Sequence, residues 1–184
     1  MNQHDMTRNM VLAALFAALT AIGAFLQIPT GTVPITLQFL FTALAGLLLG
    51  WKWGAISQLL YVGNGLLGLP VFTQGGGIGY VLQPSFGFLL GLIPAAAVIG
   101  ALTARRTGYL TVLAAVLVGD LILYAVGVPY MYLILHVYMQ SAKTFPALLA
   151  AMLVYVPGDT LKIIVVTALA PVLRRTLAKA VPNL

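Results

Sequence analysis

One apolar stretch of the sequence carries both an acid and a base. Residues Ala147–Ala170 read ALLAAMLVYVPGDTLKIIVVTALA, a run long enough to cross a bilayer, which takes about 20 apolar residues. Asp159 and Lys162 stand three positions apart in it, so a helix places both side chains on one face. Because ionisable residues inside membrane spans are costly and mark functional sites, the stretch predicts a membrane helix with a functional ion pair.

The composition of the whole chain agrees with a membrane protein. Of its 184 residues, 61% are hydrophobic and 7% are charged, with no Glu, and the mean hydropathy is +1.06. A soluble domain carries about 25% charged residues. Its long apolar runs lack the two-residue alternation of a barrel, and helices satisfy their own backbone in lipid. We expect an all-α integral membrane protein that forms a single domain over residues 1–184.

Apolar segments divide the chain into about six expected transmembrane helices. The second and third are short for a span, and the fifth is long enough that Gly127-Val128-Pro129 should kink or interrupt it. The first run is too long for a cleavable signal peptide. The expected segments are Asn9–Ile28, Ile35–Gly50, Gly54–Leu67, Pro84–Leu102, Tyr109–Tyr138 and Pro146–Leu173.

The distribution of Lys and Arg predicts the orientation in the membrane. With six spans both termini lie on one side, and positive charge favours the cytoplasmic side. Lys143 alone falls on the opposite side, and Lys162 lies within a span. The residues on the terminal side are Arg8, Lys52, Arg105, Arg106, Arg174, Arg175 and Lys179. We therefore expect cytoplasmic termini and contact with membrane lipid. We do not expect nucleic-acid binding, because the charge of +6 is spread over segment ends.

The loop Leu69–Pro84 is rich in glycine and falls on the outer side in this topology. It reads LPVFTQGGGIGYVLQP, and glycines permit a positive φ and close backbone approach to a ligand. It has neither the Gly-Lys-Ser/Thr nor the Gly-x-Gly-x-x-Gly spacing of a phosphate loop. A plain connector is the alternative, but Val71, Phe72, Ile78 and Tyr80 disfavour disorder. The loop is interpreted as an extracellular cap over a ligand pocket.

The pair of Asp159 and Lys162 has two possible roles, one structural and one in ligand binding. Pro157-Gly158 weakens the helix just before them, and Asp159 could cap the restarted helix, so the pair could be a structural staple. Buried ion pairs are poor stabilisers, which favours instead a polar floor that orients a small molecule. Further candidate ligand contacts on the outer half are Gln38, Thr36, Tyr80, Gln74, Gln83, Phe72 and Asn64. Asp120 and His136 are not expected to contact the ligand.

Alanines in the first segment repeat at four-residue spacing. They form two small-residue stripes, Ala13/Ala17/Ala21 and Ala14/Ala18. Such stripes allow close helix packing in lipid. Packing within the bundle and packing against a partner are both compatible with this spacing.

The residues for catalysis are missing from the sequence. There is no Cys and there are two distant His, so no metal cluster and no thiolate chemistry is expected. No Gly-x-Ser-x-Gly motif and no nucleotide-binding motif occurs. These features indicate solute capture without a metal or cofactor, driven by energy from another chain, rather than an enzyme.

Five sequence motifs stand out along the chain. They are Val33–Gln38, Gly68–Phe72, Gly75–Tyr80, Gln83–Gly91 and Pro157–Lys162. Pro-Gly-Asp-x-x-Lys with Gly-Leu-Pro-Val-Phe is the specific combination. These motifs resemble the BioY family, the biotin-specific substrate-binding (S) components of energy-coupling factor (ECF) transporters, and the resemblance covers nearly the whole chain. Asp120 departs from the family pattern, in which an uncharged residue is expected there.

The resemblance implies a function, partners and site residues. It implies a six-helix bundle in the plasma membrane of a prokaryote that captures biotin from outside, with a transmembrane coupling protein and two ATPase subunits as partners. Asp159 and Lys162 would contact biotin, and Ala13/Ala17 or Ala14/Ala18 would face the coupling protein. The alternatives are an S component for another vitamin, such as riboflavin or thiamine, and a small intramembrane enzyme that uses Asp159.

Overall fold

Helices make up nearly all of the regular structure. The computed structural model describes residues 3–30, 33–105 and 108–180. Four helical stretches are long and apolar enough to cross a membrane, which confirms the predicted all-α membrane class. The helices are α1 (Gln3–Phe25), α2 (Gln38–Leu66), α3 (Phe86–Leu102), α4 (Tyr109–Leu133), α5 (Phe145–Ala151) and α6 (Val156–Ala180).

Helix α2 reverses direction at Gly50, so it supplies two antiparallel passes. Gly50 has φ 76° and ψ 179°, a backbone conformation that residues with a side chain rarely adopt. The two halves pack very closely beyond the turn, because a Cβ on Gly54 would lie 2.8 Å from the Cα of Gly46. The expected second and third segments are therefore the two halves of α2.

Helix α4 is not interrupted at Gly127-Val128-Pro129, where the sequence analysis expected a kink or an interruption. It continues through Pro129, because lipid-spanning helices tolerate proline when neighbouring groups satisfy the freed carbonyl. A kink at this point stays a prediction. The irregularity comes later, in the single π-helical turn η2 (Ile134–Tyr138). The segment as a whole thus keeps its expected bounds.

The expected last segment is divided before the Pro-Gly pair. A 3₁₀ turn, η3 (Met152–Val154), separates α5 from α6. Pro157 and Gly158 lie inside the first turn of α6, and the backbone N–H of Asp159 donates to the carbonyl of Tyr155 at 2.9 Å. The suggestion that Asp159 caps the restarted helix is therefore wrong, since its own N–H is already part of the helical ladder.

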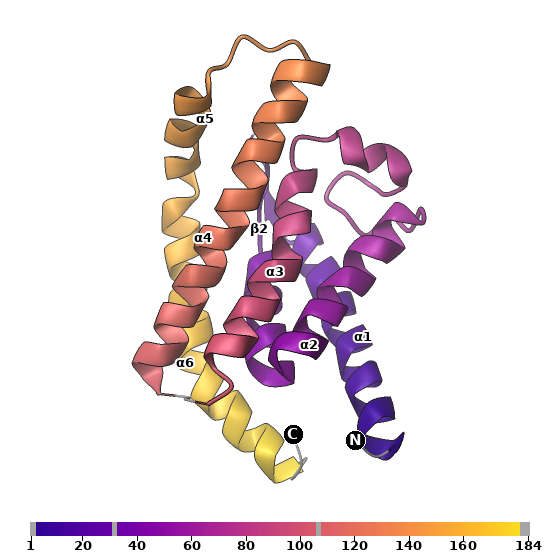
Figure 1. The fold of residues 1–184 in the computed structure, drawn as a ribbon, viewed down its shortest axis with the longest axis vertical. Coiled ribbons are helices and arrows are strands. Elements are labelled where there is room, and N and C mark those ends of the chain that lie inside the picture. The colour runs from indigo at the N-terminus through magenta and orange to yellow at the C-terminus, as the bar shows by residue number, and fades with distance from the viewer. Residues whose placement is uncertain (1–2, 31–32, 106–107, 181–184) are drawn as a thin grey trace.

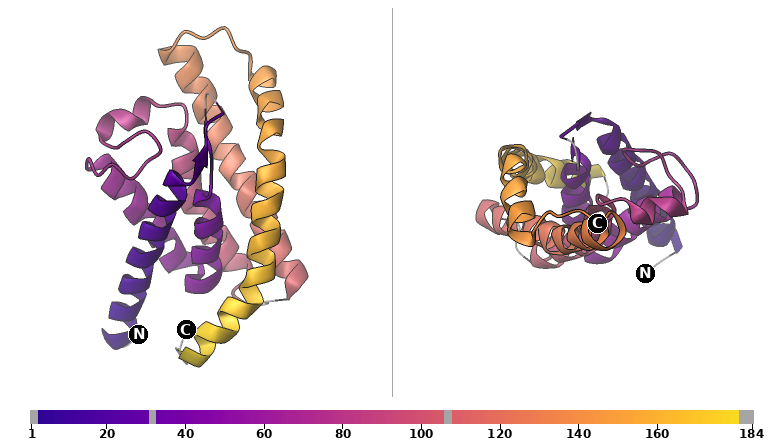
Figure 2. Two further views of the ribbon diagram at one scale, coloured as in Figure 1. Left: turned by 180° about the vertical axis from the view of Figure 1, so that it is seen from behind. Right: turned by 90° about the horizontal axis from the view of Figure 1, so that it is seen from above.

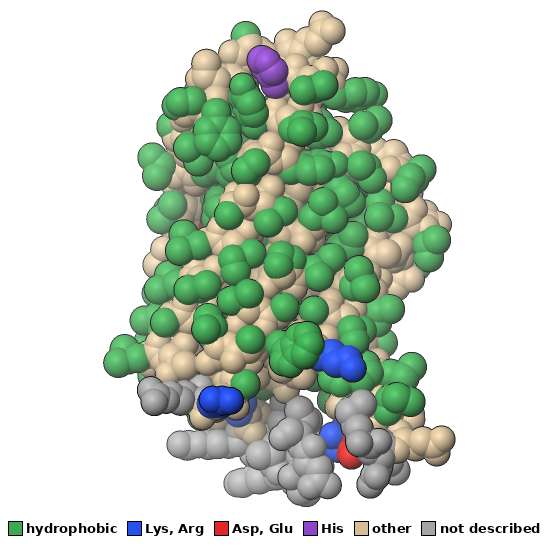
Figure 3. Space-filling view, in the orientation of Figure 1, with side chains coloured by type: hydrophobic (Ala, Val, Ile, Leu, Met, Phe, Trp, Pro, Cys, Tyr) green, Lys and Arg blue, Asp and Glu red, His purple; other side chains and the backbone are tan. Residues whose placement is uncertain are grey.

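The start of α1 and the end of α6 lie at the same end of the bundle, here called the terminal end, and the Gly-rich loop lies at the other end (Figure 1). On the face shown in Figure 3, Lys and Arg side chains gather at the terminal end, and apolar side chains cover most of the rest. This agrees with the expected topology, although the side to which each end faces stays a prediction. Arg106 and the side chains of Arg175 and Lys179 lie outside the described residues.

Buried polar side chains connect α1 to the α2 hairpin. Gln58 is fully buried, accepts from Thr42 Oγ1 at 2.9 Å, and donates to Thr20 Oγ1 at 3.2 Å and Ser57 Oγ at 3.0 Å. An unpaired amide would be costly there, so these contacts fix how α1 and both halves of α2 meet.

Arg174 also connects helices through hydrogen bonds, at the terminal end of the bundle. Its guanidinium donates to the carbonyl of Leu47 at 2.6 Å and to that of Thr103 at 3.3 Å. Both carbonyls lie near helix ends, where the last turn has no helical partner for its acceptors. Arg174 thereby ties α6 to α2 and α3.

A short antiparallel hairpin lies between α1 and α6 (Figure 2). Strand β1 (Gln27–Ile28) pairs with β2 (Ile35–Thr36), with Gln27 opposite Thr36. The sequence analysis placed both strands at the ends of the expected helices Asn9–Ile28 and Ile35–Gly50, so these helix ends are corrected to strands. The hairpin matters because it directs the Thr36 backbone towards α6.

Candidate ligand-binding site

A cavity of about 620 Å³, which includes its part open to solvent, lies near the loop end of the bundle. The hairpin, the Gly-rich loop and four helices contribute to its wall. Apolar and aromatic side chains dominate this wall, and Asp159 and Lys162 contribute the charge. The lining residues are Val33, Pro34, Ile35, Thr36, Gln38, Phe39, Thr73, Tyr80, Ser85, Phe88, Leu89, Leu92, Leu123, Tyr124, Met152, Tyr155, Asp159 and Lys162.

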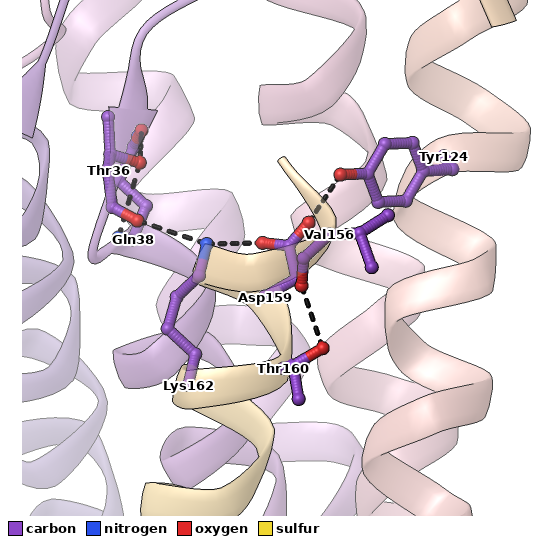
Figure 4. Close-up of polar contacts among 7 residues, drawn as sticks. All are labelled: Thr36, Gln38, Tyr124, Val156, Asp159, Thr160 and Lys162. Carbon is purple, nitrogen blue, oxygen red and sulfur yellow. Dashed lines mark hydrogen bonds and ion pairs between the residues drawn. The ribbon is translucent and has the colours of Figure 1, made fainter. Parts of the chain in front are cut away.

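Asp159 and Lys162 form a buried ion pair in the cavity wall. Lys162 Nζ lies 2.5 Å from Asp159 Oδ1, and both side chains are 9% exposed. Tyr124 from α4 donates a hydrogen bond to Asp159 Oδ2, and Lys162 also donates to the carbonyl of Thr36 at 3.2 Å. Figure 4 shows Tyr124 and Lys162 reaching Asp159 from opposite sides. The neighbours thus hold both charged groups in defined orientations.

Thr36 and Gln38 extend the polar part of the wall. Thr36 Oγ1 donates to Gln38 Oε1 at 2.8 Å, and Gln38 is 7% exposed at the start of α2. These two residues adjoin the ion pair through the Thr36 carbonyl. The site therefore combines a cation, an anion and an amide within one apolar cavity.

The Gly-rich loop is ordered by aromatic packing. Phe72 is 1% exposed and fits against Gly65, where an added Cβ would lie 2.0 Å from the ring. The centroid of its ring is 5.5 Å from that of Tyr61 and 4.5 Å from that of Tyr80. Tyr80, in the 3₁₀ turn η1 (Ile78–Leu82), lines the cavity. Phe72 therefore anchors the loop and places Tyr80.

The structure separates the candidate ligand contacts into two groups. Five of them line the cavity, namely Asp159, Lys162, Gln38, Thr36 and Tyr80. The other four do not line it, and their ligand contact stays a prediction. Phe72 packs behind the wall. Gln74 and Gln83 are exposed in the loop, and Asn64 is exposed near the end of α2.

With this geometry established, comparison with known proteins places the chain in a family. The model of the BioY family matches residues 1–179. The chain belongs to the BioY family. It is 52% identical over 147 residues to "Probable biotin transporter BioY" of Lysinibacillus sphaericus, covering 79% of this chain and 75% of that one. It is 35% identical to "Biotin transporter BioY" of Thermotoga maritima, covering 89% and 94% of the two chains.

A solved structure shows the same fold as this BioY family member. The S-component for biotin from an ECF-type ABC transporter superposes with a TM-score of 0.83 at 30% identity, over 95% of each chain. The family resemblance and the helical-bundle fold expected from the sequence are thereby confirmed. The chain is a multi-pass membrane protein of a transporter family.

Aromatic residues of this BioY cavity escaped the sequence analysis. Tyr124 and Tyr155 both line the cavity, and Tyr155 donates to the carbonyl of Val33 in the hairpin. Phe39 and Phe88 complete the aromatic wall. Helices that are apolar all round give no periodic signal for their inward face. The one available clue was the short spacing from Tyr155 to Asp159.

Asp120 lies outside the cavity wall, one helical turn before Tyr124 on α4. Its Oδ1 is buried and has no hydrogen-bond partner among the described residues. The expectation that Asp120 does not contact the ligand agrees with this placement. We have no physical account of its charge.

The two alanine stripes of α1 face different surroundings. Ala13 and Ala17 are 0% and 7% exposed, and they pack inside the chain's own bundle. Ala14 and Ala18 are exposed on the outer surface of α1. Of the residues predicted to meet a coupling protein, Ala14 and Ala18 are therefore the ones with an accessible surface.

Proposed function

We propose that this chain captures biotin as the membrane-embedded S component of an ECF-type transporter. The observation that carries this proposal is its likeness to the S-component for biotin over 95% of both chains, at a TM-score of 0.83. The BioY relatives are named as biotin transporters, which supports the same solute. Members of this family transport a solute, so the chain is a transport subunit and not an enzyme.

The chemistry of the cavity suits biotin. Biotin offers two ureido N–H donors, one ureido carbonyl, a carboxylate and an apolar bicyclic body. Asp159 is an acceptor for a ureido N–H, and Lys162 is a donor for the ureido oxygen or the carboxylate. Tyr80, Phe88 and Tyr124 line the same cavity with rings that cover apolar surface. Pockets of this kind combine an apolar wall with a few placed polar groups.

The energy for uptake comes from other chains in this proposal. A transmembrane coupling protein and two ATPase subunits form the rest of the transporter, in the plasma membrane of a prokaryote. The terminal end faces the cytoplasm, which agrees with its positive charge, and the Gly-rich loop caps the cavity from outside. Ala14 and Ala18 contact the coupling protein, because small side chains permit close helix approach.

Ligand identity is tested by calorimetry on the purified chain in detergent. We expect nanomolar binding of biotin, about −11 to −13 kcal/mol, and no saturable response to riboflavin or thiamine. Saturable riboflavin or thiamine binding without a biotin response would instead support an S component for another vitamin.

Dependence on partners is tested in liposomes. The chain alone should not concentrate biotin, and addition of the coupling protein and ATPases with internal ATP should produce accumulation. Accumulation against a gradient by the lone chain would contradict the proposed role.

A further inference from the structure

A chain of hydrogen bonds leads from the cavity to the Gly-rich loop. Gln38, in the cavity wall, donates from Nε2 to the hydroxyl of Tyr61 at 2.8 Å. Tyr61 in turn donates to the carbonyl of Val71 at 3.0 Å. Tyr61 is 2% exposed and does not line the cavity. Any effect of Tyr61 on a ligand is therefore transmitted through Gln38.

The donor and acceptor of each of these two hydrogen bonds follow from chemistry alone. The Val71 carbonyl accepts hydrogen bonds and donates none, so the single proton of the Tyr61 hydroxyl is committed to it. The Gln38 atom beside that hydroxyl must then be a donor, which is the amide nitrogen. The reversed amide would place two acceptors against one proton and leave a buried polar atom unsatisfied.

The orientation of the Gln38 amide sets what it presents to the cavity. Its nitrogen points to Tyr61, and its oxygen lies 2.8 Å from Thr36 Oγ1, which donates to it. A carbonyl oxygen has two lone pairs, so one acceptor site of the Gln38 oxygen remains. The wall thus offers an acceptor at Gln38 in the same cavity as the Lys162 cation.

We propose that Tyr61 is a positioning residue that fixes the Gln38 amide with its oxygen available to an N–H of the ligand. The proposal rests on the function proposed above, in which that N–H belongs to the ureido ring of biotin. Tyr61 donates its proton to the Val71 carbonyl of the packed loop. The position of the loop therefore determines which end of the Gln38 amide is presented to the ligand. A ligand that presents an acceptor at this point is disfavoured.

The variant Tyr61→Phe removes the hydroxyl and keeps the ring that packs edge-on to Phe72. We expect biotin affinity to fall about tenfold, the size of one hydrogen bond that sets an orientation. Tyr130→Phe is the matched control, because Tyr130 also donates to a carbonyl of the loop, that of Val81 at 2.7 Å, and also lies outside the cavity wall. The difference is that Gln38 donates to the hydroxyl of Tyr61. If loop tethering alone mattered, both variants would lose affinity equally, and the proposal would be overturned.

A double-mutant cycle separates positioning from a general structural effect. In a Gln38→Met background there is no amide to orient, so Tyr61→Phe should change biotin affinity by less than about twofold. A second tenfold loss in that background would show that Tyr61 does not act through Gln38.

The ligand provides a readout that needs no Gln38 variant. Biotin methylated on either ureido nitrogen lacks one N–H donor. For one of the two isomers, wild type and Tyr61→Phe should bind with affinities within about twofold, while they differ for biotin. A full difference for both isomers would contradict the proposal. Failure of the wild type to bind biotin would refute the proposed function instead, whereas equal biotin affinity of wild type and Tyr61→Phe would refute this inference alone.

Discussion

Lys162 Nζ lies 2.5 Å from the Oδ1 atom of Asp159, one turn earlier in α6, inside the wall of a largely apolar cavity. Thr36 and Tyr124 supply further hydrogen bonds from the hairpin and from α4. A buried ion pair contributes little net stability, since desolvation offsets the attraction. Its position in a cavity wall therefore favours a role in ligand recognition, which the following variants test.

Asp159→Asn should weaken biotin binding by about 2 kcal/mol, or about 30-fold, because a neutral acceptor replaces a charged one. Calorimetry measures the affinity, and the melting temperature in detergent reports the fold. Asp5→Asn is the matched control, because Asp5 forms an i,i+3 pair with Arg8 at 3.3 Å in α1, away from the cavity. Equal biotin affinity of Asp159→Asn and Asp5→Asn would mean that Asp159 does not contribute to ligand binding.

Tyr124→Phe should reduce biotin affinity about tenfold, because the Asp159 carboxylate loses the donor that orients it. The apolar ring remains in the wall, so the apolar cover of the cavity is kept. Tyr132→Phe serves as control on the same helix, where the ring stacks on His136 at 5.3 Å outside the cavity. The orienting role is rejected if Tyr124→Phe binds biotin as tightly as Tyr132→Phe does.

The two alanine stripes should respond differently to a larger side chain. Ala14→Leu changes an exposed position, so the chain should fold and bind biotin but fail to co-purify with the coupling protein. Ala17→Leu overpacks the interior and should cost about 1–3 kcal/mol of stability. Normal assembly of the Ala14→Leu variant would remove Ala14 from the proposed partner surface.

Arg174→Met should lower the melting temperature without a change in ligand affinity. It removes the donors to the Leu47 and Thr103 carbonyls, a loss of about 1–3 kcal/mol. Biotin affinity should stay within about twofold, because distant sites act independently. Arg105→Met, an exposed cation at the same end, should leave both quantities unchanged. A melting temperature for Arg174→Met equal to that of Arg105→Met would show that Arg174 does not tie the helices.

The sequence predicted those features that depend on residue type and close spacing. Charges inside apolar segments are rare, so Asp159 and Lys162 stood out without any knowledge of the fold. The turn between the second and third expected segments also followed from local sequence, since Gly50 adopts a positive φ there. The bounds of α4 with η2 agree with the expected fifth segment.

The features that the sequence analysis missed depend on how helices rotate and pack. Tyr124 lines the cavity because α4 turns that face towards α6, and no polar–apolar periodicity marks the inward face of a lipid-spanning helix. The same reason left Ala13/Ala17 and Ala14/Ala18 equivalent until the rotation of α1 was known. Gln74 and Gln83 are exposed and do not line the cavity, because the anchoring of Phe72 decides which loop side chains turn inward.

The most direct test of the account is biotin calorimetry on the double variant Asp159→Leu/Lys162→Met, compared with wild type. Removing both charges leaves no unpaired buried ion, so the fold should be kept or even stabilised. We predict a melting temperature at or above that of wild type and a loss of biotin affinity of at least about 100-fold. A well-folded double variant that binds biotin with unchanged affinity would contradict the claim that this ion pair recognises the ligand.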